Sequence, residues 1–495
     1  MPFSLAAFCQ YLQNLRALLQ YEEHNPLLFN SGLFLWLFLG FYGGYVLLAR
    51  HTDARLLYVT AFSLFFYYKS SGILFLLLVW ATGLDYVLAR LIDRYEHPRP
   101  RTAMLVVSIV ANLGLLFYFK YANFLVSIGD AITQSHHDPL GIVVPAGISF
   151  FTFQSLSYTI DVYKRKLKPV KSLLDYAFFV SFFPQLVMGP IVRAIDFLPQ
   201  VRERVVLTRE DFARATWLIM GGLFKKMVIA DYVSLNLVDR IFENPRLYTG
   251  IESLFAVYGY AIQIYCDFSG YSDIAIGLAL LLGIHFPINF RTPYRSTDIA
   301  EFWRRWHISL SSWLRDYLYI PLGGSRKGTL RTYINLFLTM LIGGLWHGAA
   351  WRFVLWGALH GGALAIERFV ESRFRLPRNT FVRIVRWVIT FHFVCFCWVF
   401  FRAHDLTLAT DVLTNIATDF HPEIALAFFT GYRSVLLIVA LGYVLHFTPD
   451  EWASAAERSF TKTPLLVKIL LMVCLVWLLA QVKSSELQPF IYFQF

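Results

Sequence analysis

Residues 336–365 read LFLTMLIGGLWHGAAWRFVLWGALHGGALA, in which Arg352 is the one charged side chain. Crossing the hydrocarbon core of a bilayer takes about 20 apolar residues in a helix. This stretch is longer than one crossing, and glycines interrupt it near its middle. It therefore predicts a pair of membrane helices with His347 placed inside it, in which the glycines would let another helix or a substrate chain approach the backbone closely.

The whole chain has the composition of a membrane protein. Of its 495 residues, 57% are hydrophobic, 18% aromatic and 16% charged, whereas soluble domains have about 25% charged residues. Further apolar stretches lie at 31–49, 105–118, 177–192, 253–282, 388–401, 434–447 and 465–479. We expect an all-α integral membrane protein with roughly 10 to 13 membrane elements, some of them re-entrant or interfacial.

Two regions are expected along the chain. In residues 1–26, Leu5, Phe8 and Leu12 recur at helical spacing, which predicts an amphipathic helix lying on the membrane interface or packed on the bundle. The start has no basic leader, so no cleaved signal peptide is expected. Residues 27–495 have no repeat or long linker and are expected to form one polytopic domain. Prolines beside apolar runs indicate re-entrant segments that line an internal chamber.

The net charge of +11 is concentrated in short connections, at 90–101, 164–171, 225–226, 326–331 and 373–386. The positive-inside rule places such loops in the cytoplasm, so the charge indicates topology and not nucleic-acid binding. A basic cytoplasmic face also suits an anionic donor such as a coenzyme A thioester. The five cysteines predict neither a disulfide framework nor a metal site.

A second unusual stretch is EFWRRWHISLSSWLRDYLYIPLGG, residues 301–324. As one helix it gathers its aromatic side chains on one side, with arginines falling away from it. His307 lies at the edge of that aromatic face, one turn from Trp303 and Ser311. The segment is too amphipathic to span lipid, so we expect it to lie flat at the interface or to dip into the protein.

Ionisable side chains inside apolar stretches are costly and are functional candidates by default. For His347, a catalytic role and a packing role between helices are both open, whereas His360 is more typical of a structural histidine. Asp267 and Asp273 are six residues apart and point to different faces of a helix, so each is expected to hold an arginine such as Arg291 or Arg295.

Gln154 and Tyr158 are one helical turn apart. Two interpretations remain open for them, lining of the internal chamber and hydrogen bonding between helices.

Six segments carry a family resemblance. They are GISFFTFQSLSYTIDVY (147–163), SFFPQLVMGPIVR (181–193), YCDFSGYSDIAIG (265–277), NFRTPYRSTDIAEFWRRWHISLSSWLRDYLYIPLGGSR (289–326), GGLWHGAAWRFVLWG (343–357) and CWVFFRA (397–403). Together they resemble the membrane-bound O-acyltransferase family, in particular its bacterial branch that contains the alginate O-acetyltransferase membrane subunit. The resemblance covers nearly the whole chain after Pro26.

The resemblance implies a ring of tilted helices around a thinned centre, in which a channel links a cytoplasmic donor to an extracytoplasmic acceptor. The catalytic histidine of the WHG motif falls on His347, and the second functional histidine falls on His307. Candidates that line the substrate channel are Trp346, Trp303, Ser311, Gln154, Tyr158, Asp267, Asn289, Arg291 and Tyr294.

The resemblance also implies a route for the acyl group, in the bacterial inner (cytoplasmic) membrane. Acetyl-CoA is the expected donor, a periplasmic or membrane-anchored acetyltransferase partner receives the acetyl group, and a cell-surface polysaccharide is the final acceptor. Neutral imidazole suits removal of a proton from an attacking hydroxyl, for a contribution of roughly 100- to 10,000-fold. We expect His347 to be that base and His307 to orient or stabilise the acyl group or the acceptor, together with the indole N–H of Trp346. A thioester is already activated, so no metal and no tightly bound cofactor is expected.

Other functions remain open. Peptidoglycan O-acetylation and D-alanylation of teichoic acids use the same chemistry on other acceptors. From another class, many spans with internal polar groups also describe a polysaccharide or lipid transporter, although no inverted halves are visible in the sequence.

Overall fold

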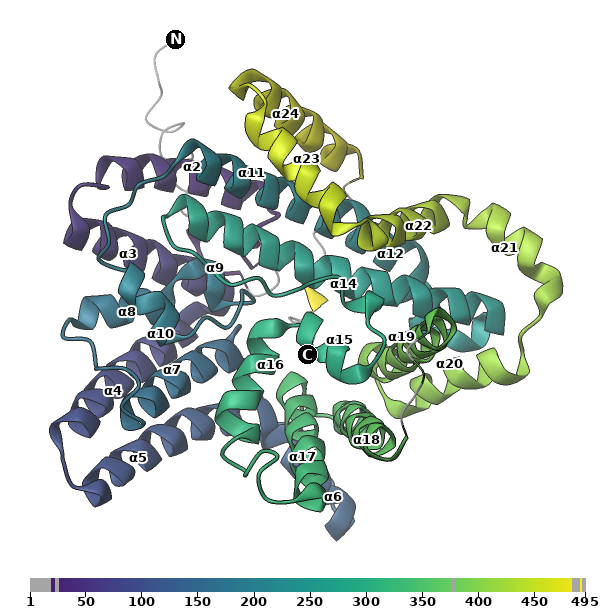
Figure 1. Cartoon of the computed structure of the whole chain (residues 1–495), viewed down its shortest axis with the longest axis horizontal. Coiled ribbons are helices and arrows are strands. Elements are labelled where there is room, and N and C mark those ends of the chain that lie inside the picture. The colour runs from purple at the N-terminus through teal and green to yellow at the C-terminus, as the bar shows by residue number, and fades with distance from the viewer. Residues whose placement is uncertain (1–18, 23–25, 375–376, 378, 483–489, 492–495) are drawn as a thin grey trace. The chain divides into compact units, whose positions relative to one another are not determined.

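The computed structural model describes residues 19–22, 26–374, 377, 379–482 and 490–491. Its regular elements are helices (Figure 1), and no strand occurs among the described residues. The predicted all-α fold is confirmed. The amphipathic helix predicted within residues 1–26 lies almost entirely outside the described residues. Backbone contacts divide the chain into two compact units, an N-terminal unit (Met1–Met188 with Val192–Val205) and a C-terminal unit (Gly189–Ile191 with Val206–Phe495).

The N-terminal unit is a helical bundle held by buried polar contacts as well as apolar packing. The Asp85 carboxylate is buried and accepts hydrogen bonds from Ser108 Oγ at 2.6 Å and Asn112 Nδ2 at 2.8 Å. These bonds join α4 to α5, as expected where a polar group lies inside an apolar bundle. The helices of the unit are α2 (Gly32–Leu47), α3 (Thr52–Ser71), α4 (Phe75–Arg94), α5 (Pro98–Leu116), α6 (Ala122–Thr133), α7 (Ile148–Tyr163), α8 (Leu173–Ser181), α9 (Phe183–Leu186) and α10 (Ala194–Phe197).

The C-terminal unit is built around one long helix, α14 (Gly250–Leu281). A capping box starts α14, since the Thr249 N–H donates to Glu252 Oε2 at 2.9 Å. The other helices are α11 (Arg209–Leu223), α12 (Asp231–Val233), α13 (Asp239–Glu243), α15 (Ile299–Arg305), α16 (Ile308–Leu314), α17 (Thr329–His347), α18 (Trp351–Arg373), α19 (Thr380–Arg402), α20 (Leu406–Thr418), α21 (Ala425–Gly431), α22 (Arg433–Phe447), α23 (Asp450–Lys462) and α24 (Leu465–Val482).

Among the described residues, five helical stretches are long and apolar enough to cross a membrane, or up to seven if each of two bent helix pairs is one span. The five are Thr52–Arg94, Pro98–Thr133, Gly250–Leu281, Trp351–Arg373 and Thr380–Arg402. The bent pairs are Pro422–Gly431 with Arg433–Phe447, at 88°, and Asp450–Lys462 with Leu465–Gln481, at 118°. The ten to thirteen membrane elements expected from the sequence included shorter and re-entrant helices. The five to seven spans counted here include only helices long enough to cross the membrane.

The apolar stretch 177–192 differs from the sequence expectation, because it is broken into short pieces. The backbone leaves the helix at Phe182, where ψ is 108°, so α8 ends and α9 begins at Phe183. Pro184, in the first turn of α9, has no N–H to continue the helix of α8. This stretch is therefore not a straight span.

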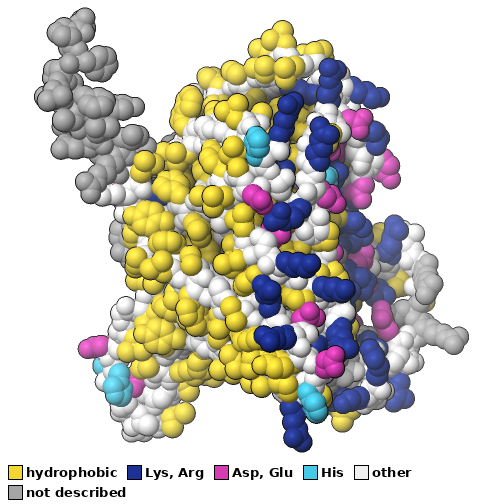
Figure 2. All heavy atoms as spheres, turned by 90° about the vertical axis from the view of Figure 1, so that its left-hand side faces the viewer, with side chains coloured by type: hydrophobic (Ala, Val, Ile, Leu, Met, Phe, Trp, Pro, Cys, Tyr) yellow, Lys and Arg dark blue, Asp and Glu magenta, His cyan; other side chains and the backbone are white. Residues whose placement is uncertain are grey.

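The basic loops 90–101 and 164–171 lie together in the N-terminal unit. The Arg101 guanidinium donates to the Tyr163 carbonyl at 2.7 Å, and the Tyr86 hydroxyl donates to the Lys171 carbonyl at 2.7 Å. Figure 2 shows a face on which Lys and Arg side chains form a band beside a broad apolar area. A band of cations bordering an apolar surface is the pattern of a membrane protein whose basic loops share one side of the bilayer.

Candidate active site

The helix pair predicted at 336–365 forms from α17 and α18, which lie side by side (Figure 1), and glycines allow their close approach. A β-carbon on Gly357 would lie 2.5 Å from the Met340 carbonyl oxygen, and one on Gly361 would lie 2.9 Å from Phe337 Cα. A β-carbon on Gly344 would collide with the Phe353 carbonyl. The two backbones are therefore in contact, as small residues at membrane helix interfaces allow.

His347 is the last residue of α17 and is 3% exposed. Aromatic rings surround its imidazole. Ring-centroid distances are 4.9 Å to Trp346, 5.1 Å to Trp356 on α18, and 5.3 Å to Phe401 on α19. Trp346 was predicted from the sequence as a site residue, whereas Trp356 and Phe401 were not. Both of them lie in motifs that carry the family resemblance.

His307 occupies a break in the segment that the sequence analysis treated as one helix. That expectation is wrong, because α15 ends at Arg305 and α16 begins at Ile308, with His307 in the left-handed conformation at φ 44° and ψ 55°. Such a backbone costs of order 1–3 kcal/mol and persists where the surroundings impose it. The aromatic side of the segment is buried, with Trp306 and Leu310 each 1% exposed.

Asn289 imposes this turn and fixes the proton on His307. The Asn289 carbonyl accepts from Ile308 N–H at 2.9 Å, and its side-chain Oδ1 accepts from Ser309 N–H at 3.1 Å. His307 Nδ1 lies 3.2 Å from the same Oδ1. Because Oδ1 can only accept, Nδ1 carries the proton and Nε2 carries the lone pair.

The Nε2 of His307 is available for chemistry. The side chain is fully buried, and no partner of Nε2 occurs among the described residues. His307 lies outside the long spans, and burial lowers the pKa of its imidazole to about 3. The ring is therefore neutral at physiological pH, and its Nε2 accepts a hydrogen bond or a proton.

One indole lies beside both histidines. Trp346 has ring-centroid distances of 6.2 Å to His307 and 4.9 Å to His347. Residues forty positions apart in sequence thus lie beside the same ring. The Phe268 ring covers His307 at 4.6 Å. The centre is buried, aromatic and equipped with two imidazoles.

Comparison with known proteins identifies the family of this chain. Residues 62–406 match the model of the MBOAT, membrane-bound O-acyltransferase family. The chain belongs to this family.

Three relatives of this membrane-bound O-acyltransferase illustrate the range of similarity. A peptidoglycan O-acetyltransferase of Helicobacter pylori is 40% identical over 420 residues, 79% of this chain and 80% of that protein. A probable alginate O-acetylase AlgI of Pseudomonas putida is 37% identical over 492 residues, 95% of this chain and 100% of that protein. A teichoic acid D-alanyltransferase of Bacillus subtilis is 31% identical over 313 residues, 59% of this chain and 76% of that protein. Family membership makes the chain a membrane O-acyltransferase.

Asp267 and Asp273 of this acyltransferase are held by lysines and not by the arginines expected from the sequence. Lys226 Nζ lies 2.6 Å from Asp267 and 2.8 Å from Asp231, and Lys225 Nζ lies 2.6 Å from Asp273. Both lysines were predicted to lie in a short connecting loop. This prediction is wrong, since they lie in a helical segment packed along α14. The position of two lysines directly after the apolar run that ends in Gly222–Phe224 could have indicated from the sequence that they are buried and paired with acidic residues.

Asp267 also meets the end of the chain. Its Oδ2 accepts from the Ile491 N–H at 3.1 Å, and the Phe490 ring lies 4.4 Å from Lys226 Nζ. Asp267 is therefore an anchor within the C-terminal unit, and it precedes Phe268, the residue that covers His307.

The remaining predicted site residues have different surroundings. Trp303 lies beside Trp356 at 5.6 Å and His360 at 5.2 Å, and Ser311 Oγ donates to the Trp306 carbonyl at 3.2 Å. The Tyr294 hydroxyl donates to the Ala261 carbonyl at 2.6 Å, which places it in the aromatic core. Arg291 is exposed.

Gln154 and Tyr158 lie on α7 of the N-terminal unit and are fully buried. The Tyr158 hydroxyl accepts from the Val170 N–H at 3.1 Å. Their roles, like those of the other predicted site residues, stay predictions.

Proposed function

We propose that this acyltransferase moves an acetyl group from cytoplasmic acetyl-CoA across the bacterial inner membrane for O-acetylation of an extracytoplasmic, alginate-like polysaccharide. A periplasmic or membrane-anchored acetyltransferase partner receives the group first. The alginate and peptidoglycan acetylating relatives support an acetyl group and a polymer acceptor. The band of cations supports an anionic donor on one side of the membrane. The observation that carries the proposal is the buried pair His307 and His347, both of which lie beside Trp346.

The acetyl group moves by attack of an acceptor hydroxyl on the thioester carbonyl. His347 takes the hydroxyl proton as the new C–O bond forms, and the C–S bond breaks. The coenzyme A sulfur leaves as a thiolate and receives that proton. No other reactant is needed, because the thioester supplies the free energy of the transfer.

The two histidines have different parts in this scheme. An Nε2 that carries a lone pair can accept a hydrogen bond but cannot donate one to a carbonyl oxygen. His307 therefore orients an O–H or N–H group of a substrate. Of the two roles expected from the sequence, orienting and stabilising, this is the orienting one.

Charge on the carbonyl oxygen needs a donor, and Trp356 is placed to provide one. Its ring lies 5.1 Å from His347, and its Nε1 is buried without a partner among the described residues. A buried N–H left unpaired costs about 1–3 kcal/mol. A developing oxyanion beside His347 would satisfy this donor, as in other preorganised sites.

The test uses the purified full chain in proteoliposomes loaded with acetyl-CoA labelled in its acetyl group, with alginate or peptidoglycan outside, each with and without a periplasmic acetyltransferase partner. In a separate arm a D-alanyl carrier-protein thioester replaces acetyl-CoA as the donor. We expect release of free coenzyme A with the acetyl label moved to an acceptor, and loss of both in His347→Ala. Movement of intact labelled substrate without release of coenzyme A would identify a transporter instead. A folded His347→Ala protein with the wild-type rate would refute the role of His347.

A further inference from the structure

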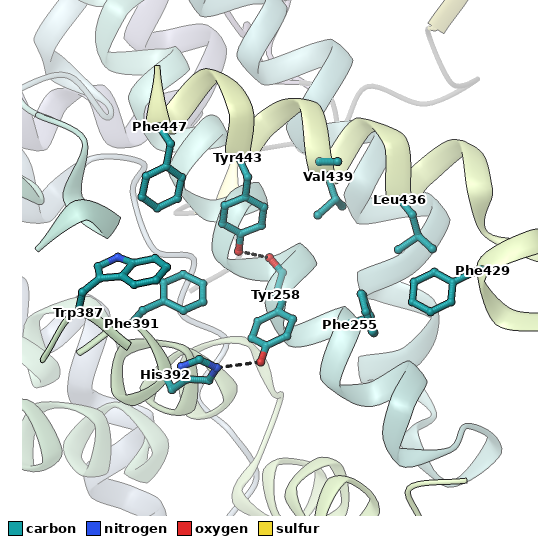
Figure 3. Close-up of a pocket in the computed structure, with 11 residues that line it drawn as sticks. Phe255, Tyr258, Trp387, Phe391, His392, Phe429, Leu436, Val439, Tyr443 and Phe447 are labelled. Atoms are coloured by element: carbon teal, nitrogen blue, oxygen red, sulfur yellow. Dashed lines mark hydrogen bonds between the residues drawn. The ribbon is translucent and has the colours of Figure 1, made fainter. Parts of the chain in front are cut away.

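An apolar groove lies in the C-terminal unit between α14, α19 and α22 (Figure 3). Its volume is about 540 Å³, within the range of about 300–1,000 Å³ that small-molecule sites occupy. The α22 wall runs from Leu436 to Phe447, or roughly 16 Å at 1.5 Å per residue. That is about half of a hydrocarbon core of ~30 Å, the depth of one leaflet.

The polar side chains that line the groove are engaged with one another or with the backbone. His392 Nδ1 lies 2.8 Å from the Val388 carbonyl, which can only accept, so Nδ1 donates and Nε2 accepts from the Tyr258 hydroxyl at 3.0 Å (Figure 3). The Tyr443 hydroxyl donates to the Tyr258 carbonyl at 2.8 Å.

Trp387 completes this set, since its Nε1 donates to the Tyr294 carbonyl at 2.8 Å. None of these four side chains has a donor hydrogen left for a ligand. A sugar, nucleotide or peptide would lose its hydrogen bonds to water on entering the groove, whereas a hydrocarbon would lose none.

Arg383 lies one helical turn beyond one end of the groove. Trp387 and Phe391 line the groove one helical turn apart on α19, and Arg383 lies one further turn toward the start of that helix. Positions four apart on a helix share a face. Arg383 is exposed, and no ion pair of Arg383 occurs among the described residues. Its neighbour Arg386 differs, since it lies 3.1 Å from Glu371.

A single extended hydrocarbon chain matches the apolar lining of the groove. Aromatic rings at the level of an arginine are also the usual border between hydrocarbon and lipid headgroups.

We propose that this groove binds one acyl chain of an anionic phospholipid, with the lipid phosphate at Arg383. The site is separate from the histidine centre and does not depend on the proposed acceptor or donor. The bound chain packs against α14, α19 and α22, and Arg383 selects the anionic headgroup. Attraction of this kind contributes about 1 kcal/mol per cation at a membrane surface, or a preference of roughly fivefold over a zwitterionic lipid.

The test uses the full chain in nanodiscs with phosphatidylglycerol that carries a photoreactive diazirine on its acyl chain, followed by mass spectrometry of the modified peptides. We expect modification of the groove-facing residues of α19 and α22. Ala440→Trp, which fills the groove, should lower this modification at least fivefold. The matched control is Leu437→Trp on the same helix, because Leu437 is 69% exposed and lies outside the groove.

The charge is tested by competition with unlabelled phosphatidylglycerol or phosphatidylcholine. We expect phosphatidylglycerol to compete several-fold better with wild type, and the two lipids to compete equally with Arg383→Glu. Size-exclusion profiles establish that each variant is folded. Equal modification of Ala440→Trp and Leu437→Trp, or no headgroup preference in wild type, would overturn the proposal.

Discussion

His307 and His392 both lie in the C-terminal unit among aromatic rings, but only one of them has a ring nitrogen available for chemistry. Both nitrogens of His392 are engaged, Nδ1 with Val388 and Nε2 with Tyr258. In His307, Asn289 holds Nδ1 while Nε2 has no partner among the described residues. Aromatic surroundings alone therefore do not mark a reactive histidine. A reactive histidine is marked more specifically by a fixed tautomer that leaves one ring nitrogen with a lone pair and no hydrogen-bond partner.

The largest expected effect comes from removing the available imidazole. His307→Ala should lower the acetyl-transfer rate by about 100- to 10,000-fold, the range for groups that assist proton transfer or orient its partners. The rate is measured in proteoliposomes as release of free coenzyme A. His421→Ala is the control, because His421 is exposed and bonded to Asp419 and Glu423. An equal decrease in transfer rate in the two variants would contradict a specific role of His307 in the reaction.

The second effect concerns the helix pair that carries His347. Gly357→Ala places a methyl group 2.5 Å from the Met340 carbonyl, and overpacking of this kind costs typically 1–3 kcal/mol. We expect a lower thermal midpoint in detergent and a lower transfer rate. Gly362→Ala on the same helix is the matched control, since a β-carbon there meets nothing within 4 Å. A midpoint for Gly357→Ala as high as that of Gly362→Ala would contradict the close contact.

The third effect is a change in pH dependence. In wild type, His307 has a pKa lowered to about 3, so its base form persists as pH falls from 8 toward 4 and is lost only below that range. In Asn289→Asp, a carboxylate would favour the imidazolium and raise this pKa. An acidic limb should then appear in the transfer rate at higher pH than in wild type. Identical profiles of the two proteins between pH 5 and 8 would argue against protonation control at His307.

The smallest effect is expected in the groove. Tyr258→Phe removes the hydrogen bond to His392 Nε2, and one such bond contributes about 0.5–1.5 kcal/mol. Thermal unfolding in detergent should show a small decrease in midpoint, with a change in transfer rate far below that of His307→Ala. A loss of transfer as large as in His307→Ala would place the groove within the reaction centre.

Parts of the site were predictable because their signals are local. The glycines beside Trp346 and His347 predicted a close approach by another helix or by a substrate chain, and the structure shows that α18 makes this approach to α17. The WHG and RRWHISLS motifs pointed to His347 and His307. Helical periodicity failed at His307 itself, because the Asn289 contacts that turn the backbone come from eighteen residues earlier in the chain. Periodicity describes a continuous helix and carries no information about a partner outside it.

The amino-acid sequence alone determined the membrane environment, the all-α class and the family, since apolar length, small residues and short motifs act within a few turns of helix. Only the tertiary structure decided which charges pair and which histidine nitrogen carries the proton. Lys226 meets Asp267 from forty-one residues away, and Asn289 reaches His307 across the break before α16. Ion pairing and the position of the imidazole proton depend on side chains that packing brings together. The partner within hydrogen-bond distance determines how a buried charge is compensated and which nitrogen of a buried imidazole is protonated.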